Sequence, residues 1–373
     1  MKAIIAAAGT GGHINPGIAI ANKIMQEEPD SEIIFIGTKR GLENDLVPRA
    51  GYELKTVDSY GISRSLSIKN IKRLVKTIGA IRSSKHIIKE FNPDIVIGTG
   101  GYICISVCKA AKKLKVPYVI HESNVLPGIS TKLLAKKAAK VLVGFKETRE
   151  KLPKTANIVV TGTPTKVRKL ELTEKEISEK RKALGFDDKK PIILVFGGSQ
   201  GAQSINTSMC DIIKEVENGK KLNYQIMWAT GPKQFDEAKL NLKISDIDIE
   251  NIKGIKVVPY IYDMEEVMNV VDLLVCRSGA MTVTEIEKVG KPAIFIPYPY
   301  AAENHQEYNA RALENAKAAK VILDKDLSAK LLDQTIEDLI KDKETLKEMG
   351  ENSHAQSMDH VKENIYTEIK LVK

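Results

Sequence analysis

The chain has 373 residues, of which 43% are hydrophobic and 28% charged, and its formal net charge at pH 7 is +9. This length exceeds what one hydrophobic core usually serves, so we expect two domains, and the hydrophobic content excludes a disordered chain. No stretch approaches the ~18 consecutive apolar residues of a transmembrane helix. The four cysteines lie in apolar segments without the spacing of zinc ligands, which is typical of reduced core thiols.

The positive charge is concentrated in the first half of the chain. Residues 1–164 hold 26 Lys and Arg against 13 Asp and Glu, whereas the remaining residues hold 31 against 35. A basic half predicts a polyanionic partner, either an anionic membrane face or a nucleic acid. The single Trp and the aromatic content of 5% disfavour single-stranded nucleic acid, which proteins usually hold by stacking.

The first predicted strand, residues 2–8, ends in a glycine-rich loop at residues 9–13, and this loop leads into a helix containing Pro16. A dinucleotide-binding fingerprint needs a third glycine where this chain has Ile14, and no Lys-Ser or Lys-Thr pair follows that would make a P-loop. The loop still offers backbone N–H groups to a phosphate or a sugar. His13 beside them is either a catalytic base or an ordinary cap or core residue.

Further strands of the first half end in similar loops. Residues 99–102 repeat the glycine-rich design, and residues 121–124 follow another apolar strand. Because ligands bind outside the carboxyl ends of the strands in open α/β sheets, we expect these loops to face one cleft. The remaining predicted elements of this half are strands at 32–37, 52–57, 93–98, 118–120, 141–144 and 158–160, and a short helix at 41–50.

A basic amphipathic helix is predicted at residues 67–91. A stripe of this kind either packs on the core or lies in a membrane interface beside anionic lipid, and the sequence leaves both possibilities open. The apolar positions at helical spacing are Ile68, Ile71, Leu74, Val75, Ile78 and Ile81, and the basic positions around them are Lys69, Lys72, Arg73, Lys76 and Arg82.

The second half of the chain restarts the pattern of the first. Residues 161–165 and the charged run to residue 190 are interpreted as a linker and a surface helix. Residues 191–197 then open a second sheet, and glycines again follow the strand at 197–201. Further predicted elements are strands at 224–229, 255–259 and 272–276, a helix at 263–269, and closing helices within 342–373.

Residues 275–306 carry the strongest binding signal of this half. Residues 277–279 break an apolar strand before a helix that should begin near Ala280, so unpaired N–H groups and the positive end of a helix dipole lie at the strand's carboxyl end. A diphosphate fits such a site. Glu285 lies within two helical turns, where it can accept hydrogen bonds from sugar hydroxyls but would repel a phosphate. The pattern favours a ribose diphosphate, and an ordinary strand-loop-helix with a solvated Glu is the alternative.

Six motifs taken in order resemble the MurG family, the peptidoglycan N-acetylglucosaminyltransferases that make lipid II from lipid I. The resemblance covers residues 1 to about 345, and six motifs at these intervals are specific although each alone is weak. The motifs begin at Gly9 (GTGGH), Gly100 (GGY), His121 (HExNxxPG), Gly197 (GGSQGA), Ser278 (SGAxTVTE) and His305 (HQxxNA).

The resemblance implies an α/β fold of the GT-B class, in which two Rossmann-like doubly wound domains face each other across a cleft. Residues 1–162 would form an acceptor and membrane-associating domain, residues 163–345 a UDP-sugar-binding domain, and residues 346–373 closing helices. The partners implied are UDP-N-acetylglucosamine, lipid I and the anionic cytoplasmic face of the bacterial membrane, to which the protein would bind peripherally. Neither a nucleic acid nor a cofactor is expected.

The resemblance also implies a role for each matched residue. On the donor side, Glu285 binds the ribose hydroxyls, and the Ile261 backbone binds the uracil. The other residues expected to bind UDP-N-acetylglucosamine are Ser199, Ala280, Met281 and Thr282 at the diphosphate, Gln306, Asn124 and Asn309 at the sugar, and Thr10, Gly11, Gly12 and Lys166. The residues expected on the acceptor side are His13, Gly100, Gly101, Tyr102 and Asn124, with the loop of Thr10, Gly11 and Gly12.

The chain departs from the family pattern at three places. Ser123 replaces the usual Gln, Thr131 replaces the usual Asn, and residues 163–166 stand where Asn-Pro followed by an Arg is more common. That Arg packs near the nucleotide base in relatives. The sequence leaves open whether Lys166 or Arg168 substitutes for it here.

The implied reaction is attack by the C4 hydroxyl of the lipid I muramoyl sugar on C1 of the donor sugar, with inversion and loss of UDP. His13 is the candidate base, because an imidazole can take up a proton near neutral pH. Helix N-terminal N–H groups at Ala280 and the glycine loop at 197–201 would meet the charge of the leaving group. No metal site is predicted, because the sequence has no Asp-x-Asp motif or His cluster.

Three other functions remain as alternatives. A diacylglycerol glycosyltransferase would share the architecture, the basic face and the UDP-sugar site, but the motif at 121–128 favours the muramoyl acceptor. A UDP-N-acetylglucosamine epimerase has a soluble substrate and would leave the basic half without a purpose. A nucleotide-binding module without catalysis is disfavoured by the presence of His13, Glu285 and Gln306.

Overall fold

The computed structural model describes residues 1–59, 68–198, 200–248 and 252–373, and the side chains of residues 68–78 are not described. The chain divides into two compact units. The first comprises Met1–Thr165 and Met358–Lys373, and the second comprises Lys166–Ser357. Within the described ranges, no helix is both long enough and apolar enough to cross a membrane.

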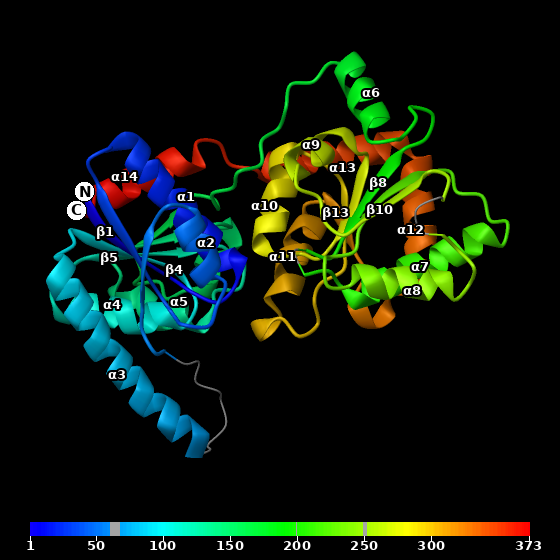
Figure 1. The fold of residues 1–373 in the computed structure, drawn as a ribbon. Coiled ribbons are helices and arrows are strands. Elements are labelled where there is room, and N and C mark those ends of the chain that lie inside the picture. Colours follow the sequence, from blue (N-terminus) through cyan, green and yellow to red (C-terminus); the bar gives the residue numbers. More distant parts are fainter. Residues whose placement is uncertain (60–67, 199, 249–251) are drawn as a thin grey trace. The chain divides into compact units, whose positions relative to one another are not determined.

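The first unit is built on a parallel sheet of seven strands in the order β3-β2-β1-β4-β5-β6-β7 (Figure 1). Its strands are β1 (Lys2–Ala7), β2 (Glu32–Gly37), β3 (Glu53–Thr56), β4 (Ile95–Gly100), β5 (Tyr118–Glu122), β6 (Lys140–Val143) and β7 (Ile158–Val160). Its helices are α1 (Gly11–Glu27), α2 (Glu43–Arg49), α3 (Ile68–Phe91), α4 (Ile103–Lys113), α5 (Ile129–Leu134) and α14 (Val361–Lys370), with 3-10 helices η1 (Ala135–Lys137) and η2 (Lys146–Lys151).

Helices cover both faces of this sheet, and successive strand residues point to opposite faces, so each strand contributes to two cores. Ile4 and Ala6 of β1 pack in one core with α4 and the carboxyl-terminal part of α3. Ala3, Ile5 and Ala7 pack in the other core with α1 and α14. The apolar run that predicted the first strand is therefore a strand covered on both faces.

The basic helix predicted at 67–91 is α3, and its apolar stripe has two parts. Ile81 packs against the core of the first unit, together with Ala80 and Ile88. The positions from Ile68 to Ile78 belong to the part of α3 whose side chains lie outside the described residues. In Figure 1 this part of the helix extends beyond the edge of the first unit. Packing on the core is thus established only for the carboxyl-terminal end of the stripe.

The second unit repeats the design with a parallel sheet of six strands in the order β10-β9-β8-β11-β12-β13. Its strands are β8 (Ile192–Phe196), β9 (Gln225–Ala229), β10 (Ile255–Val258), β11 (Leu273–Cys276), β12 (Ala293–Phe295) and β13 (Ala319–Val321). Its helices are α6 (Glu174–Ala183), α7 (Gln203–Glu217), α8 (Phe235–Lys243), α9 (Met264–Val270), α10 (Ala280–Val289), α11 (His305–Asn315), α12 (Ala329–Lys341) and α13 (Lys343–Gln356), with η3 (Ala302–Asn304) and η4 (Asp324–Asp326). Two doubly wound α/β units of this kind confirm the predicted fold class.

The closing helices belong to different units. α13 packs on α10 in the second unit, whereas α14 packs on α1 in the first, where the two helices lie side by side in Figure 1. Ile365 and Ile369 of α14 are fully buried in the core that contains β1. Lys23 of α1 pairs with Glu363 at 2.8 Å. The end of the described chain therefore completes the unit with which the chain begins.

Candidate active site

Both sheets place their glycine-rich loops at a topological switch point, where successive connections leave in opposite directions. In the first unit this point lies between β1 and β4, which are followed by the loops at residues 8–10 and 100–102. In the second unit it lies between β8 and β11. Because ligands of open α/β sheets bind at such points, each unit carries one candidate binding edge.

His13 lies in the first turn of α1, at the edge of the first unit, and is partly exposed. Its Nδ1 lies 3.0 Å from the carbonyl oxygen of Ala8. Since a carbonyl oxygen can only accept, Nδ1 carries the proton in the neutral ring, and Nε2 keeps its lone pair. This tautomer is the one that a general base acting through Nε2 requires.

The two loops of the first unit are in direct contact. The Thr99 hydroxyl donates to the His13 carbonyl oxygen at 2.8 Å. Gly100 and Gly101 have φ of +133° and +83°, and a Cβ would lie 2.2 Å from His13 Cδ2 at the first and 2.6 Å from the Ala8 oxygen at the second. Only glycine fits both positions. These glycines are explained by the close approach of the loops, and their contact with an acceptor stays a prediction.

Glu43 holds the start of the first loop by a hydrogen bond to Gly9, a role that no sequence pattern indicated. Its fully buried carboxylate accepts hydrogen bonds from the Gly9 N–H at 2.9 Å, the Thr38 N–H at 2.9 Å and the Thr38 hydroxyl at 2.7 Å. Burial acts to raise the pKa of Glu43, but these hydrogen bonds outweigh it and the pKa lies below the ordinary value. The carboxylate is therefore kept charged and fixes where the loop begins.

Glu122 organises the loop after β5 in a similar way. Its carboxylate accepts from the backbone N–H and the side-chain amide of Asn124, both at 3.0 Å, and from the Gly128 N–H at 2.9 Å. The Thr131 hydroxyl donates to it at 2.6 Å, so the residue that departs from the family pattern still supports the loop. Asn124 is the partly exposed residue at this strand end, whereas His121 is buried against the Gly162 carbonyl oxygen.

The candidate edge of the second unit is centred on the start of α10. Its N-cap residue, Gly279, has no side chain with which to cap the helix, so Ala280 and the residues after it present backbone N–H groups and the positive end of the helix dipole. Glu285 lies further along α10 and is partly exposed. Burial raises the pKa of the Cys276 thiol, and the Glu285 carboxylate acts in the same direction. The arrangement suits a phosphate at the helix start and hydroxyl groups at Glu285.

The turn before α10 is braced by α11. The Ser278 hydroxyl donates to the Gln306 carbonyl oxygen at 2.8 Å, and the side-chain amide of Asn309 donates to the Ser278 carbonyl oxygen at 3.1 Å. Asn309 is fully buried, so its position supports the turn, and its contact with the donor sugar stays a prediction. The side-chain oxygen of Gln306 accepts from the Tyr298 N–H at 3.0 Å, which orients this amide at the same edge.

Arg277 fixes the loops around β11 to one another. Its buried guanidinium donates to the carbonyl oxygens of Ile296 and Pro297 at 3.0 and 3.1 Å and to the Ser204 hydroxyl at 3.0 Å. It also pairs with Asp324 at 2.5 Å. The sequence indicated only that residues 277–279 end a strand, because the partners of Arg277 come from distant loops.

Relatives and solved structures identify the family. Residues 3–143 match the glycosyltransferase family 28 N-terminal domain, and residues 192–365 match the glycosyltransferase family 28 C-terminal domain. The UDP-N-acetylglucosamine--N-acetylmuramyl-(pentapeptide) pyrophosphoryl-undecaprenol N-acetylglucosamine transferase of Acetivibrio thermocellus is 41% identical over 370 residues, covering 99% of this chain and 98% of the relative. The transferase of the same name from Clostridioides difficile is 41% identical over 374 residues, covering 100% of this chain and 89% of the relative. The chain belongs to this family of N-acetylglucosamine transferases.

The structural comparison agrees with membership of the transferase family. The crystal structure of Acinetobacter baumannii MurG matches with a TM-score of 0.79 at 27% identity over 99% of both chains. The UDP-GlcNAc 2-epimerase from Neisseria meningitidis matches with a TM-score of 0.64 at 14% identity, which shows a shared fold alone. The family predicted from the six motifs is confirmed, and the epimerase alternative is less well supported.

The other residues that the transferase resemblance singled out have the following places. Ser199 lies outside the described residues, and Ile261 is buried. Lys166 is exposed, whereas the Arg168 guanidinium pairs with Glu265 at 3.1 Å, so the two candidates for the family Arg differ in their surroundings. The residues that begin helices at the two candidate edges are Thr10, Gly11 and Gly12 at α1, Tyr102 at α4, and Met281 and Thr282 at α10.

Among the described residues, no group of three or more His, Cys, Asp or Glu side chains is arranged to hold a metal ion. The four cysteines are buried as free thiols.

Proposed function

We propose that the chain transfers N-acetylglucosamine from UDP-N-acetylglucosamine to the C4 hydroxyl of the muramoyl sugar of lipid I, which is undecaprenyl-diphospho-N-acetylmuramoyl-pentapeptide. The product is lipid II, and C1 of the donor sugar is inverted. The observation that carries the proposal is 41% identity over the whole length to transferases whose names specify this sugar and this acceptor. The two candidate edges supply groups for this reaction.

In the proposed reaction, His13 Nε2 takes the proton of the C4 hydroxyl while that oxygen attacks C1. The bond from C1 to the diphosphate oxygen breaks, and its electron pair leaves with UDP. The Ala8 carbonyl oxygen holds His13 in the tautomer that can accept this proton. The first N–H groups of α10 stabilise the charge that develops on the diphosphate, and Glu285 accepts hydrogen bonds from the ribose hydroxyls.

The function is tested by a turnover assay that offers lipid I and diacylglycerol side by side with labelled UDP-sugars. We expect transfer only to lipid I and only from UDP-N-acetylglucosamine. Transfer to diacylglycerol, which the glycosyltransferase alternative requires, would overturn the acceptor assignment. Interconversion of the UDP-sugar without any acceptor would instead support the epimerase alternative.

Replacing Glu285 by Ala is expected to raise the KM for UDP-N-acetylglucosamine about 10- to 150-fold. The ribose hydroxyls would lose a charged acceptor, an interaction of roughly 1.5–3 kcal/mol. Donor kinetics and thermal melting measure the effect, and Glu348→Ala, an exposed Glu of the same unit, is the matched control. An unchanged donor KM with normal turnover would remove Glu285 from the nucleotide site.

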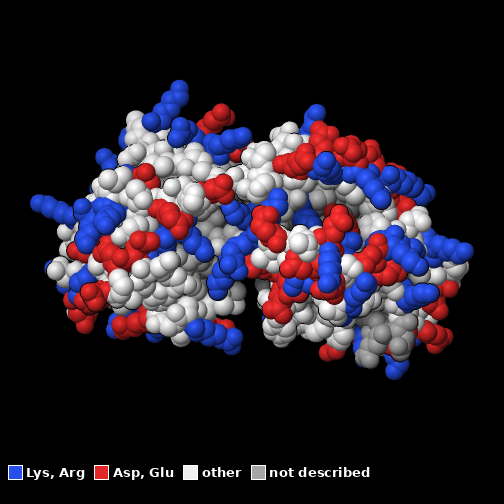
Figure 2. Space-filling model, turned by 90° about the horizontal axis from the view of Figure 1, so that it is seen from above, with Lys and Arg blue, Asp and Glu red and all other residues white. Residues whose placement is uncertain are grey.

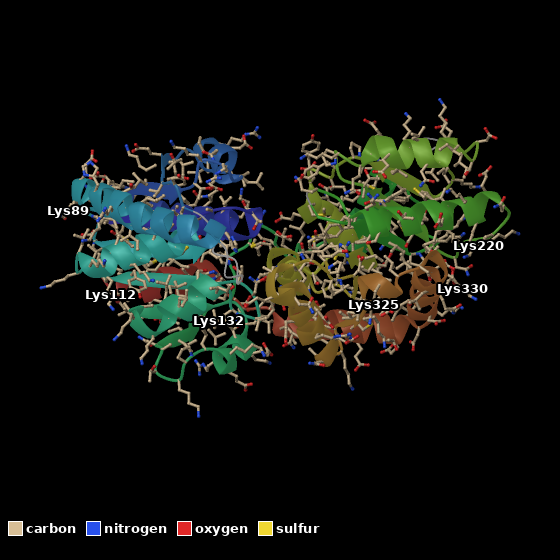
Figure 3. The ribbon with its side chains drawn as sticks, turned by 90° about the horizontal axis from the view of Figure 1, so that it is seen from below. Lys89, Lys112, Lys132, Lys220, Lys325 and Lys330 are labelled. Atoms are coloured by element: carbon tan, nitrogen blue, oxygen red, sulfur yellow. The ribbon has the colours of Figure 1, made fainter. Side chains whose placement is uncertain are left out.

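We also propose that the first unit binds the cytoplasmic face of the membrane, where lipid I would be reached. Lys89, Lys112 and Lys132 on α3, α4 and α5 lie on the face of the first unit shown in Figure 3. Lys69, Lys72, Arg73 and Lys76 lie on the part of α3 whose side chains are outside the described residues. The charge of residues 1–164 favours anionic lipid by roughly 1 kcal/mol for each basic residue near the surface.

Vesicles that contain anionic lipid are therefore expected to bind the protein, and neutral vesicles to bind it less. Added salt should weaken this binding, because exposed charges are screened over ~8–10 Å at ordinary ionic strength. Changing Lys69, Lys72, Arg73 and Lys76 together to Gln should reduce co-sedimentation without changing turnover on a water-soluble short-chain acceptor. Lys325→Gln with Lys330→Gln in the second unit is the control. Unchanged co-sedimentation of the fourfold variant would show that this segment is not the docking face.

A further inference from the structure

A cavity of about 740 Å³ opens on the second unit, away from its candidate binding edge. Pro191, Asp272 and Pro292, which directly precede β8, β11 and β12, line it, so it lies at the amino ends of the parallel strands. The other walls come from α6 with the residues around it, and from α12 and α13. Figure 2 shows basic side chains in and around a hollow on this face of the second unit.

Positive charge is in excess in this cavity. Seven Lys and Arg residues line it against three Asp and Glu residues. The acidic groups already have partners: Asp272 accepts from Arg181 at 2.7 Å and from the Ile192 N–H at 2.8 Å, and Asp188 accepts from the Ser178 hydroxyl at 2.5 Å. The third, Glu351, lies 3.9 Å from Lys347. The lining carboxylates therefore leave a net excess of cations.

Lys291 is one of the basic residues that line the cavity. Its Nζ donates to the Val271 carbonyl oxygen at 2.7 Å, and an ammonium group has three donors, so two N–H groups remain for another acceptor. Burial lowers the pKa of Lys291 to about 8; the Asp272 carboxylate acts to raise this pKa, and the positive charges of Arg181 and Lys169 act to lower it. Among the described residues, neither Lys291 nor Lys169 forms an ion pair. An anion placed here would satisfy the remaining donors of Lys291 and offset the repulsion among the three cations.

The size and lining of the cavity indicate the class of the anion. A volume of this size lies within the range of small-molecule sites and greatly exceeds one phosphate. Pro191, Pro292, Ile340 and Leu346 supply an apolar wall beside the cations. We propose that this cavity is a second ligand site, which binds a small organic molecule through a phosphate or diphosphate group held by Lys291, Lys169 and Arg181.

α10 runs from the candidate binding edge of the second unit to this cavity. The helix begins at Ala280, where the donor diphosphate is expected, and ends at Val289, directly before two residues that line the cavity, Gly290 and Lys291. The binding proposal itself does not depend on the proposed transferase activity.

The proposal is tested by the rate at which a water-soluble acetylating reagent labels individual lysines, followed by peptide mass spectrometry. Pyrophosphate and glucose 1-phosphate serve as probes, at constant ionic strength set with sodium chloride. We expect both probes to slow the labelling of Lys291 severalfold and to leave Lys330 unchanged. Lys330 is exposed on α12. It lies on the face seen from below in Figure 3, whereas Figure 2 shows the molecule from above. Stronger protection by glucose 1-phosphate would support an organic ligand.

Two matched variants distinguish specific binding in this cavity from non-specific attraction to the protein's positive charge. Lys169→Gln is expected to raise the pyrophosphate concentration for half-maximal protection of Lys291 about twofold to fivefold, the effect of one exposed cation, whereas Lys330→Gln should leave it unchanged. Equal protection of Lys291 and Lys330, no protection of Lys291 by either probe, or an unchanged half-maximal concentration in Lys169→Gln would overturn the proposal. Pyrophosphate bound only at the start of α10 would leave Lys291 labelling unaffected and would count against it.

Discussion

Replacing His13 by Ala is expected to lower kcat about 10²- to 10⁴-fold, which is the usual contribution of a positioned general base. The Ala8 carbonyl oxygen accepts a hydrogen bond from His13 Nδ1, and Gly100 leaves space for the ring, so Nε2 can accept a proton. UDP binding should stay nearly intact, because the groups proposed to bind the nucleotide belong to the second unit. Turnover and UDP affinity, measured on the same preparation, separate the two effects.

Two further variants make the His13 result interpretable. His86→Ala changes a His that is 83% exposed on α3, and it should leave kcat unchanged. His13→Asn retains a side-chain amide that can donate to the Ala8 oxygen, so it keeps the loop contact but provides no base. If His13→Asn turned over normally across the pH range, the proton would go elsewhere and His13 would have only a structural role.

Replacing Ile369 by Ala is expected to destabilise the first unit by about 2–5 kcal/mol, the range for deleting a fully buried aliphatic side chain. Ile369 is 0% exposed and packs in the core formed by β1, α1 and α14. Removing its methyl groups leaves a cavity between α14 and the sheet, because the surrounding side chains relax only partly. Hydrogen exchange of peptides from β1, measured by mass spectrometry, reports on this unit.

The controls for Ile369 come from the chain itself. Leu371, two residues further on, is 69% exposed, so Leu371→Ala should change stability by less than ~0.5 kcal/mol. The single Trp of the chain, Trp228, is buried in the second unit, so its fluorescence follows that unit alone. A loss of stability in Ile369→Ala that appeared equally in Trp228 fluorescence would contradict a role specific to the first unit.

Much of the fold was predictable because local patterns determine it. The apolar run that became β1 is buried on both faces, and the glycines after it mark the turn into α1. The place of α14 was not predictable in the same way. The spacing of Ile365 and Ile369 predicts a helix with one apolar face, but which sheet that face covers depends on contacts with residues more than 300 positions earlier.

For the same reason, only some residues of the candidate site could be predicted from the sequence. His13, Ala280 and Glu285 stand in motifs next to strand ends, where sequence and topology together indicate a ligand. Glu43 and Arg277 were missed because their function is defined by partners brought together only in the folded chain. Both are buried charges held by several hydrogen bonds, and no periodicity or spacing in a single sequence marks such residues.

The return of α14 to the first unit has a consequence for synthesis of the protein. The ribosome must produce all of Lys166–Ser357 before the helix that carries Ile365 and Ile369 emerges. At about 5–20 residues per second this delay lasts roughly 10–40 s. The second unit is a continuous stretch and can complete its core within that time. Until α14 emerges, the apolar surface of α1 and β1 that it covers stays exposed to water. We expect a chaperone to bind the nascent chain at this surface.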